Sequence, residues 1–389
     1  MISDALVGTV LDDRYRVVDR IASGGMSTVY RGIDLRLDRP VALKVMDPRY
    51  AGDVQFHTRF QREARAIARL KDPGLVAIYD QGTDPAHPYL VMELVDGGTL
   101  RELLNERGPM PPHAMAAVLR PVLSGLGVAH RASLVHRDIK PENVLIATDG
   151  EVKLVDFGLV RAIAEAGITS TSVILGTAAY LSPEQVEGTP IGPSSDVYAT
   201  GILAFELLTG TTPFGGDNAL AVAQQRLDRA VGPPSAAVAG VPAELDEFVL
   251  RATARHPQDR YSDACEMGLA LERIAENLAL PHFRVPAPRR AVPTTDVTVV
   301  ERRPSAGQSF EPTRQLTVLS TGPTEEYLPD EPQEQPPTFA GIDLRDFAIY
   351  RGRSRRAAVA WTLIVAITTG LVAVASWTLG VNLHGLLDH

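Results

Sequence analysis

Apolar and polar positions divide the first 279 residues into a strand-rich part and a helix-rich part. In the first part, apolar and polar side chains alternate in short runs, a pattern typical of antiparallel strands. The predicted strands cover residues 15–21, 28–32, 40–46, 76–81 and 89–94. Between Val54 and Leu70, apolar residues recur at helical spacing and predict one helix within this part.

Helical periodicity dominates after Gly97-Gly98. The predicted helices cover residues 99–107, 113–132, 195–209, 218–230, 243–254 and 262–279. Two strand-like runs, 144–147 and 152–155, interrupt them, and Asp149-Gly150 between them is a strong hairpin signal. Residues 12–279 are therefore predicted to form an α+β domain with a small β-rich lobe and a large helical lobe.

The pattern changes again after Pro281. Residues 280–356 are rich in Pro, Thr and Glu, a composition that favours a disordered linker because it buries little apolar surface. Residues 357–381 contain no charged side chain and are long enough to cross about 30 Å of hydrocarbon. A buried core helix is the alternative, but such helices rarely lack a polar face over this length.

The flanks of this segment predict its orientation. Arg351, Arg353, Arg355 and Arg356 precede it, and no Lys or Arg follows, which places residues 1–356 in the cytoplasm and the tail 382–389 outside. Residues 1–11 are predicted to be an amino-terminal extension. The first 20 residues do not resemble a signal peptide, because they include acidic residues and no long apolar run. The expected location is therefore the cell membrane, with a single pass.

Composition narrows the classes of protein further. Of the 389 residues, 45% are hydrophobic, which excludes wholesale disorder, and the formal charge of −9 argues against direct nucleic-acid binding. One cysteine, Cys265, cannot build a disulfide framework or a cysteine-rich zinc site, and is interpreted as an inert small hydrophobe. The near-zero mean hydropathy is an average over a polar linker and an uncharged span.

The densest group of candidate catalytic residues lies in the segment VHRDIKPENV (135–144). Asp138 and Asn143 are five residues apart in a loop before a strand, with Lys140 between them. A carboxylate and an amide at this spacing suit the orientation of a hydroxyl and the ligation of a cation. Asp156 follows at a strand end in LVDFG, and with Asn143 it offers hard oxygen ligands that suit Mg²⁺ held largely through substrate phosphates.

The order of three motifs carries a family resemblance. HRDIKPEN, then DFG, then GTAAYLSPE resembles the signature set of protein kinases, and within it the eukaryotic-like, membrane-anchored Ser/Thr kinases of actinobacteria. The resemblance covers roughly residues 12–279 and implies the bilobal kinase fold, ATP as phosphate donor, and Mg²⁺ or Mn²⁺ as cofactor. It assigns Asp138 to orienting the substrate hydroxyl and accepting its proton, and Lys140 to steadying the transferred phosphoryl group.

The resemblance extends to the nucleotide site. Residues 22–29 correspond to the glycine-rich loop over the phosphates, where Gly24 is kept and Ala22 and Ser27 replace the outer glycines. Lys44 in VALK corresponds to the lysine that contacts the α- and β-phosphates, and Glu63 on the predicted helix to its ion-pair partner. Without the resemblance, Lys44 could be an exposed strand lysine, and Glu63 could belong to a solvated helix face.

Adenine contacts are implied in the same way. LVMELV (90–95) matches the connection between the lobes, with Met92 as gatekeeper and the backbone groups of Glu93 and Val95 as the adenine partners. The side chains expected to enclose the ring are Val29, Ala42 and Leu145. From the sequence alone, these residues are ordinary core positions.

Regulation and stability are predicted from the remaining motifs. Thr169 and Thr171 precede Gly176 at the positions where relatives are phosphorylated, and a phosphate there would pair with Arg137 and order the loop. An unmodified Ser/Thr loop is the alternative. Glu184 is expected to pair with Arg260, and Asp196 to brace the catalytic loop.

The predicted function is an ATP-dependent Ser/Thr protein kinase that autophosphorylates and modifies cytoplasmic proteins. A membrane-tethered pseudokinase scaffold is the competing hypothesis, but the chain keeps the charged residues that degenerate kinases lose. Linker threonines could also dock phosphothreonine readers of the FHA type, at positions 294, 295, 298, 313, 317 and 324. The sequence leaves substrates, activating signal and homodimer formation open.

Overall fold

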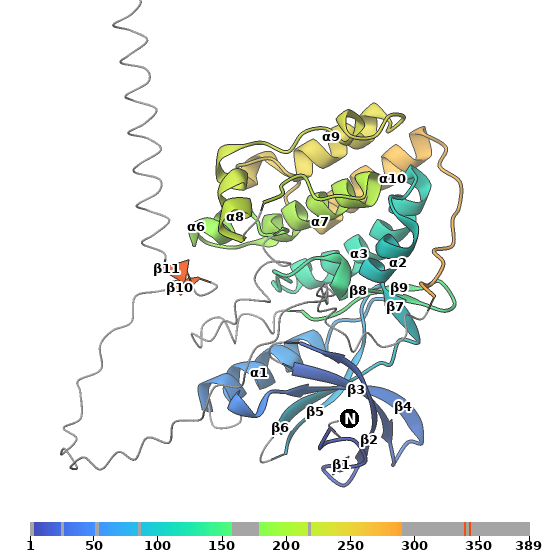
Figure 1. Ribbon diagram of the computed structural model, residues 1–389, viewed down its shortest axis with the longest axis vertical. Coiled ribbons are helices and arrows are strands. Elements are labelled where there is room, and N and C mark those ends of the chain that lie inside the picture. The colour runs from blue at the N-terminus through green and yellow to red at the C-terminus, as the bar shows by residue number, and fades with distance from the viewer. Residues whose placement is uncertain are drawn as a thin grey trace, which may run out of the picture. The chain divides into compact units, whose positions relative to one another are not determined.

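The computed structural model describes residues 4–24, 27–50, 54–84, 87–157, 179–216 and 219–289, with two short strands at 338–339 and 342–343 (Figure 1). Those two strands, β10 (Thr338–Phe339) and β11 (Ile342–Asp343), pair with each other in antiparallel fashion. The other described ranges form two lobes, one built on a sheet and one on helices.

The first lobe is a six-stranded antiparallel sheet in the order β1-β2-β3-β4-β6-β5. Its strands are β1 (Val10–Leu11), β2 (Tyr15–Ser23), β3 (Ser27–Asp34), β4 (Arg39–Met46), β5 (Ile78–Asp84) and β6 (His87–Met92). Helix α1 (Val54–Ile67) covers one face with Phe56, Phe60 and Ala64, while Tyr15, Leu43 and Tyr89 fill a second cluster. The central strands β4 and β6 are buried on both faces, which explains their nearly continuous apolar sequence.

The register of this sheet sets the positions of the predicted nucleotide residues. Val29 on β3 lies opposite Ala22 on β2 and Lys44 on β4, and Ala42 on β4 lies opposite Met92 on β6. Directly opposed residues project from the same face of a sheet, so these side chains form one group. A one-residue slip would turn all of them to the other face.

The second lobe is built around α7 (Pro193–Thr209), which is buried on nearly all sides. A helix that is apolar all round is expected at the centre of a domain. The other helices are α2 (Leu100–Arg107), α3 (Pro112–Arg131), α6 (Pro183–Glu187), α8 (Ala219–Asp228), α9 (Ala243–Ala252) and α10 (Ala264–Asn277). Helix α2 begins at a capping box formed by Thr99 and Glu102, and α7 ends at Gly210 in the left-handed conformation.

A small sheet with the order β7-β8-β9 lies where the lobes meet. It consists of β7 (Gly97–Thr99), β8 (Val144–Ala147) and β9 (Val152–Leu154), and the single-turn helix η2 (Pro141–Asn143) leads into β8. The predicted hairpin at Asp149-Gly150 is confirmed, with Gly150 at φ +87°. Three further single-turn helices are η1 (Pro48–Tyr50), η3 (Pro234–Ala236) and η4 (Pro257–Asp259).

Both predicted domain boundaries differ from the structure. Val10–Leu11, expected in the extension 1–11, forms strand β1, and Leu11 is buried. Residues 281–289, expected at the start of the linker 280–356, pack on the helical lobe and are called the strap here. Its Val285 is only 3% exposed in the main core, and the backbone N–H of Arg289 donates to Glu106 at 2.8 Å. Pro288 is also buried, and Phe283 packs on His113, so several contacts hold this proline-rich segment.

Beyond the strap, the structure describes only β10 and β11, a short strand pair within the segment predicted to be a disordered linker. Across the ranges that the structure describes, no helix is long and apolar enough to cross a membrane. The predicted span 357–381, the tail 382–389 and most of the linker lie outside those ranges, as do Thr169 and Thr171.

Candidate active site

Asp138 lies at the centre of a compact cluster in the loop before β8. Its carboxylate accepts from Lys140 Nζ at 2.8 Å and from Asn143 Nδ2 at 3.0 Å, and the Asn143 amide also donates to the Asp138 carbonyl at 2.7 Å. Asp138 is only 9% exposed. The structure therefore brings together the carboxylate, the lysine and the amide that the sequence predicted to work as one group.

Asp196, a buried residue of α7, holds the catalytic loop in place through hydrogen bonds to its backbone. Its carboxylate accepts the backbone N–H groups of His136 and Arg137, both at 2.7 Å, and contacts His130 Nε2 at 2.9 Å. Arg137 has φ +71°, which is unfavourable for a residue with a side chain and persists only where surrounding contacts fix it. The predicted bracing role of Asp196 is confirmed.

Lys44 and Asp156 form an ion pair across the site. The Lys44 Nζ lies 2.6 Å from Asp156 Oδ1, with the lysine side chain 9% exposed. Burial alone would raise the pKa of Asp156, but the charge and the hydrogen bond of Lys44 hold it below its ordinary value. Asp156 is therefore ionised at neutral pH, as a ligand of a divalent cation must be.

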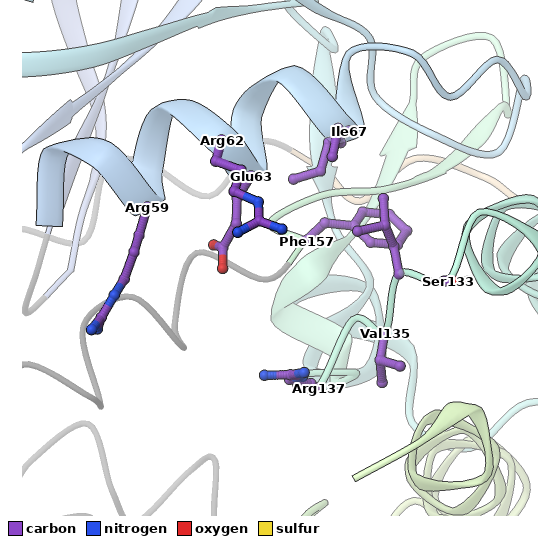
Figure 2. A pocket seen from close by; sticks show the side chains of 10 residues that line it. Arg59, Arg62, Glu63, Ile67, Ser133, Val135, Arg137 and Phe157 are labelled. Atoms are coloured by element: carbon purple, nitrogen blue, oxygen red, sulfur yellow. The ribbon is translucent and has the colours of Figure 1, made fainter. Parts of the chain in front are cut away.

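Glu63 does not occupy its predicted position. Among the described residues, Lys44 makes no ion pair with Glu63 and is paired with Asp156 instead. Glu63 extends from α1 into a cavity of about 390 Å³ that Arg137 and Phe157 also line, and Figure 2 shows these side chains facing it. The physical reason is that the pair depends on the position of α1 against the sheet, which helical spacing does not specify.

The predicted adenine-contacting side chains come together in one apolar group. Ala42 and Met92 belong to the buried cluster beneath α1, and Val29, Val95 and Leu145 pack against it. Glu93, between Met92 and Val95, donates its backbone N–H to the Ala77 carbonyl at 2.9 Å. Residues from β3, β4, the connection between the lobes and β8 thus form a single surface.

The predicted phosphate loop is partly described. Gly24 donates its backbone N–H to the Ser27 carbonyl at 2.9 Å, which joins the end of β2 to the start of β3. A Cβ placed on Gly24 would meet that carbonyl at 3.5 Å, an ordinary contact. Space alone therefore does not require glycine at this position.

Two charged residues near the site were not identified from the sequence. Lys153 on β9 contacts Glu93 at 2.8 Å and Glu151 at 3.3 Å, and although burial lowers its pKa, the two carboxylates raise it overall. Arg101 on α2 contacts Glu142 at 2.9 Å and Glu206 at 2.7 Å. Burial along β9 is continuous, so alternation does not indicate Lys153, and the partners of Arg101 are too distant in sequence to suggest themselves.

The predicted ion pair between Glu184 and Arg260 is confirmed. Arg260 Nη1 and Nη2 donate to the two Glu184 oxygens at 2.7 and 2.9 Å, and both side chains are buried. Burial would raise the pKa of Glu184, but the guanidinium and the Ser195 hydroxyl lower it. A bidentate pair of this kind fixes α6 to the loop before α10.

The donor set suits a cation bound mainly through phosphate. Both hydrogen bonds of Asn143 described above use Nδ2, so its amide oxygen is the atom available for a metal, and Asp156 is held as a carboxylate. No group of three or more His, Cys, Asp or Glu side chains that could hold a metal alone occurs in the described part of the chain. This fits Mg²⁺, which keeps few protein ligands.

Comparison with known proteins defines the class. The family model for the protein kinase domain matches residues 15–271, so the chain belongs to the protein kinase family. It is 60% identical, over 99% of its length and 98% of the relative's, to the serine/threonine-protein kinase PknL of Mycobacterium tuberculosis. PknB of the same species is 44% identical over 68% of this chain and 43% of its own length.

A solved structure agrees with the fold. The crystal structure of the Mycobacterium tuberculosis PknI kinase domain is 28% identical and matches with a TM-score of 0.55. The match covers 69% of this chain and 98% of that domain. The family and the bilobal kinase fold predicted from the ordered motifs are therefore confirmed.

Proposed function

We propose how the residues of this serine/threonine protein kinase divide the work of phosphoryl transfer. Asp138 orients the substrate hydroxyl and accepts its proton, and Lys140 steadies the transferred phosphoryl group. The observation that carries this proposal is the cluster around Asp138, whose carboxylate accepts from Lys140 at 2.8 Å and from Asn143 at 3.0 Å. Asp196 fixes the loop that carries this cluster. Fixed geometry matters because this reaction relies on positioning and charge neutralisation more than on covalent chemistry.

ATP is the proposed phosphate donor, and the apolar group of Val29, Ala42, Met92 and Leu145 is its proposed adenine surface. Backbone groups of Glu93 and Val95 are the proposed partners of the adenine edge, and Ala22 and Gly24 lie over the phosphates. Asn143 and Asp156 would hold Mg²⁺, or Mn²⁺ in its place. The ion, when bound, offsets negative charge on the phosphates.

Lys44 has two roles in this proposal. Without nucleotide it is neutralised by Asp156 at 2.6 Å, which keeps the buried lysine charge paired. In the active form Lys44 contacts the phosphates and is held by Glu63, so α1 must bring Glu63 out of the cavity that it now lines. Activation therefore exchanges one ion pair for another.

Regulation is proposed to run through Thr169 and Thr171. Autophosphorylation there would place a phosphate within reach of Arg137, whose side chain lines the cavity next to Glu63. A phosphate paired with an arginine can order the segment that carries it. This is the arrangement that would favour the inward position of α1.

The remaining proposals concern the carboxy-terminal third. We infer from its apolar run and basic flank that residues 357–381 anchor the enzyme in the cell membrane, with the kinase domain in the cytoplasm. Cytoplasmic proteins are the proposed substrates. Phosphorylated linker threonines would attract readers of the FHA type, and homodimer formation is compatible with a membrane anchor.

Incorporation of labelled phosphate from ATP by the full-length chain tests the central proposal. Asp138→Asn should lower the turnover by about 10²–10⁴-fold because it removes the proton acceptor. Lys44→Met should lower it through lost phosphate contact. Thermal melting and nucleotide binding measured on the same samples separate lost catalysis from lost folding. Unchanged turnover in folded Asp138→Asn protein would favour the pseudokinase alternative.

The regulatory proposal has its own test. Replacing Thr169 and Thr171 together by Ala should lower the turnover on an added substrate at least tenfold, whereas Ser170→Ala in the same loop serves as the matched control. Mass spectrometry of the wild-type protein should find phosphate on one or both threonines. Full activity without phosphate at either position would contradict the regulatory proposal and favour the alternative of an unmodified Ser/Thr loop.

A further inference from the structure

Helix α1 carries a row of arginines on the side that faces away from the sheet. Its buried side, which includes Phe60 and Ala64, packs toward the sheet. At about 100° per residue, Arg62 and Arg65 project in the opposite direction, and Arg69 extends the row into the turn that follows the helix. All three side chains are exposed. These three arginines are called the arginine row.

The arginine row is not balanced by acidic side chains. Within the part of the chain that the structure describes, none of the three arginines makes an ion pair. Glu63, the one carboxylate between residues 54 and 71, faces the cavity on another side of α1 (Figure 2). Arg65 and Arg69 are four residues apart, and like charges at this spacing destabilise a helix. A solvated helix face usually mixes both signs, so the row suits an external anionic partner better.

The row belongs to a basic segment of an otherwise acidic molecule. Residues 54–71 carry a net charge of +4, whereas the whole chain carries −9. The basic residues of this segment are Arg59, Arg62, Arg65, Arg69 and Lys71. A patch of one sign attracts a surface of the opposite sign even where the net charge of the protein would be repelled. The partner is therefore expected to be an extended anionic surface that meets α1 alone.

The proposed membrane anchor brings such a surface within reach. The cytoplasmic leaflet of a membrane is negatively charged. Residues 290–356 separate the strap from the predicted span, and a flexible chain of this length has an end-to-end distance of about 45 Å. Tethering at this distance gives the leaflet a high effective concentration around the kinase domain, so a weak attraction is sufficient for docking.

We propose that the outer face of α1, with Arg62, Arg65 and Arg69, docks on the anionic inner surface of the membrane. The docking rests on the anchor proposed above and identifies the surface of the domain that meets the lipid. Each arginine near an anionic leaflet strengthens the association about fivefold, and the three together about 10²-fold. Docking also relieves the repulsion along the row, which stabilises the helix that carries Glu63.

The first experiment uses the wild-type full-length chain in lipid nanodiscs. An arginine-selective dicarbonyl reagent labels exposed guanidinium groups, and mass spectrometry measures the labelling rate of each arginine. In discs that contain phosphatidylserine, the rates at Arg62, Arg65 and Arg69 should be about fivefold lower, or less, than in discs of phosphatidylcholine alone. Arg229, which is exposed after α8, should be labelled equally in both. Equal rates along the row in the two lipids would overturn the proposal.

Two further conditions distinguish an anionic membrane surface from other causes of protection. High salt should remove the difference between the two lipids, because it screens exposed charges. Inorganic phosphate added to phosphatidylcholine discs should leave the labelling rates of the row unchanged. Equal protection by phosphate would assign the row to a small anion, and protection that persists in high salt would assign it to uncharged contact. Either result would overturn the proposal.

The second experiment removes two charges of the row. Arg65→Gln together with Arg69→Gln leaves Arg62 as a reporter, and the labelling rate of Arg62 in phosphatidylserine discs should rise to that in phosphatidylcholine discs. The matched control, Arg229→Gln together with Arg255→Gln, removes two exposed arginines of the helical lobe and should leave Arg62 protected. Melting temperatures check that both variants fold. Protection of Arg62 that persists in the first variant would overturn the proposal.

Failure of the anchor and failure of the docking surface are distinguishable. A full-length chain that does not enter the discs would refute the anchor proposed for residues 357–381. Sedimentation of that chain with phosphatidylserine vesicles at low salt then tests the row by itself. The wild type should bind the vesicles at least about fivefold more tightly than the variant without Arg65 and Arg69, and equal binding would overturn the docking. A chain that enters the discs but is labelled equally in both lipids refutes the docking alone.

Discussion

The catalytic loop and the Lys44 region lie on two sides of one site, but they are held in different ways. The loop carrying Asp138 is fixed by Asp196, which is 1% exposed and accepts two backbone N–H groups at 2.7 Å. Lys44 is held by one ion pair to Asp156, and Glu63 lines a cavity elsewhere. One half of the site is assembled, and the other half needs a movement of α1.

This difference shows where regulation can act in the fold. A buried carboxylate that accepts several backbone donors cannot exchange partners without a large loss of stability. An ion pair such as Lys44–Asp156 can be exchanged at a smaller loss, because the Asp156 side chain is 29% exposed and is solvated when Lys44 changes partner. Control therefore belongs to the region of α1, and the catalytic loop provides a constant reference.

Disrupting the catalytic loop that carries Asp138 should have the largest effect on the free energy of unfolding and on turnover. Asp196→Asn leaves one amide oxygen for the two backbone N–H groups and removes the charge beside His130. Loss of one partner in such a buried network costs about 3–5 kcal/mol. Chemical denaturation should show a drop of this size in the free energy of unfolding, with turnover lost as well.

The outcome that would contradict this interpretation is specific. Asp196→Asn with unchanged stability and a tenfold or smaller loss of turnover would mean that the catalytic loop is fixed elsewhere. An isosteric change at an exposed pair provides the control. Glu272→Gln, whose partner is Arg120 at 2.8 Å, should change the free energy of unfolding by less than about 1 kcal/mol.

A substitution at Glu63 on α1 should lower the turnover and leave the stability of the fold nearly unchanged. Glu63→Gln keeps the shape of the side chain but removes the charge needed to hold Lys44 in the active form. Turnover should fall about 10–100-fold, equivalent to about 1.4–2.7 kcal/mol in the barrier. The melting temperature of the same preparation should stay within a few degrees of the wild type. A large fall in melting temperature with normal turnover would show that Glu63 contributes to stability and not to the active form of the site.

Sequence patterns predicted the fixed half better than the movable half for a physical reason. Asp138, Lys140 and Asn143 lie within six residues, so local backbone geometry alone brings them together. The strand register that aligns Val29 with Lys44 was not predicted, because β4 is buried on both faces and its sequence does not alternate. Glu63 depends on the placement of a whole helix against that sheet, and spacing along the helix carries no information about this placement.

Long-range and single-residue contacts were missed for related reasons. The partners of Arg101 are 41 and 105 residues away from it, and no local pattern links them. The strap 281–289 was assigned to the linker because the prediction rested on the average composition of residues 280–356, which are rich in proline. Val285 and Pro288 are buried and Ala287 packs against the core, and a composition argument does not register individual side chains.

The strap stabilises the hairpin that joins β8 and β9, and this contribution is smaller than that of Asp196. Arg284 Nε donates to the Asp149 carbonyl at 2.5 Å, and Val285 is buried behind it. Val285→Ala removes two methyl groups from the core and should lower the free energy of unfolding by about 1–2 kcal/mol, at about 0.8 kcal/mol per buried carbon.

Denaturation curves of the full-length chain would check the strap. Arg289→Ala in the same segment is the matched control, because that side chain is 92% exposed and pairs with Glu106 only at 3.9 Å. It should leave the free energy of unfolding within about 0.5 kcal/mol of the wild type. Equal and negligible effects of the two substitutions would show that the strap does not contribute to the domain's stability.

A further expected effect lies in the sheet lobe, where Asp34 holds the end of β3 as Asp196 holds the catalytic loop. Asp34 accepts from Arg14 at 3.0 and 2.8 Å and from the backbone N–H of Arg36 at 3.1 Å. The hydrogen bond from Arg14 lowers the pKa of Asp34 from 3.8 to about 2. Between these pH values the unfolded chain binds a proton that the folded chain does not.

The stabilising contribution of Asp34 is therefore complete above about pH 4 and is lost as the pH falls toward 2. Asp34→Asn has no proton to bind, so the stability difference between wild type and variant should be constant from pH 8 to pH 5 and shrink below pH 4. Urea denaturation over this range would measure it. A difference that stays constant down to pH 2 would show that Arg14 does not hold Asp34 ionised. The sheet lobe would then lack a buried carboxylate equivalent to Asp196 at this position, and the contrast between the two halves of the site would extend to the lobes that carry them.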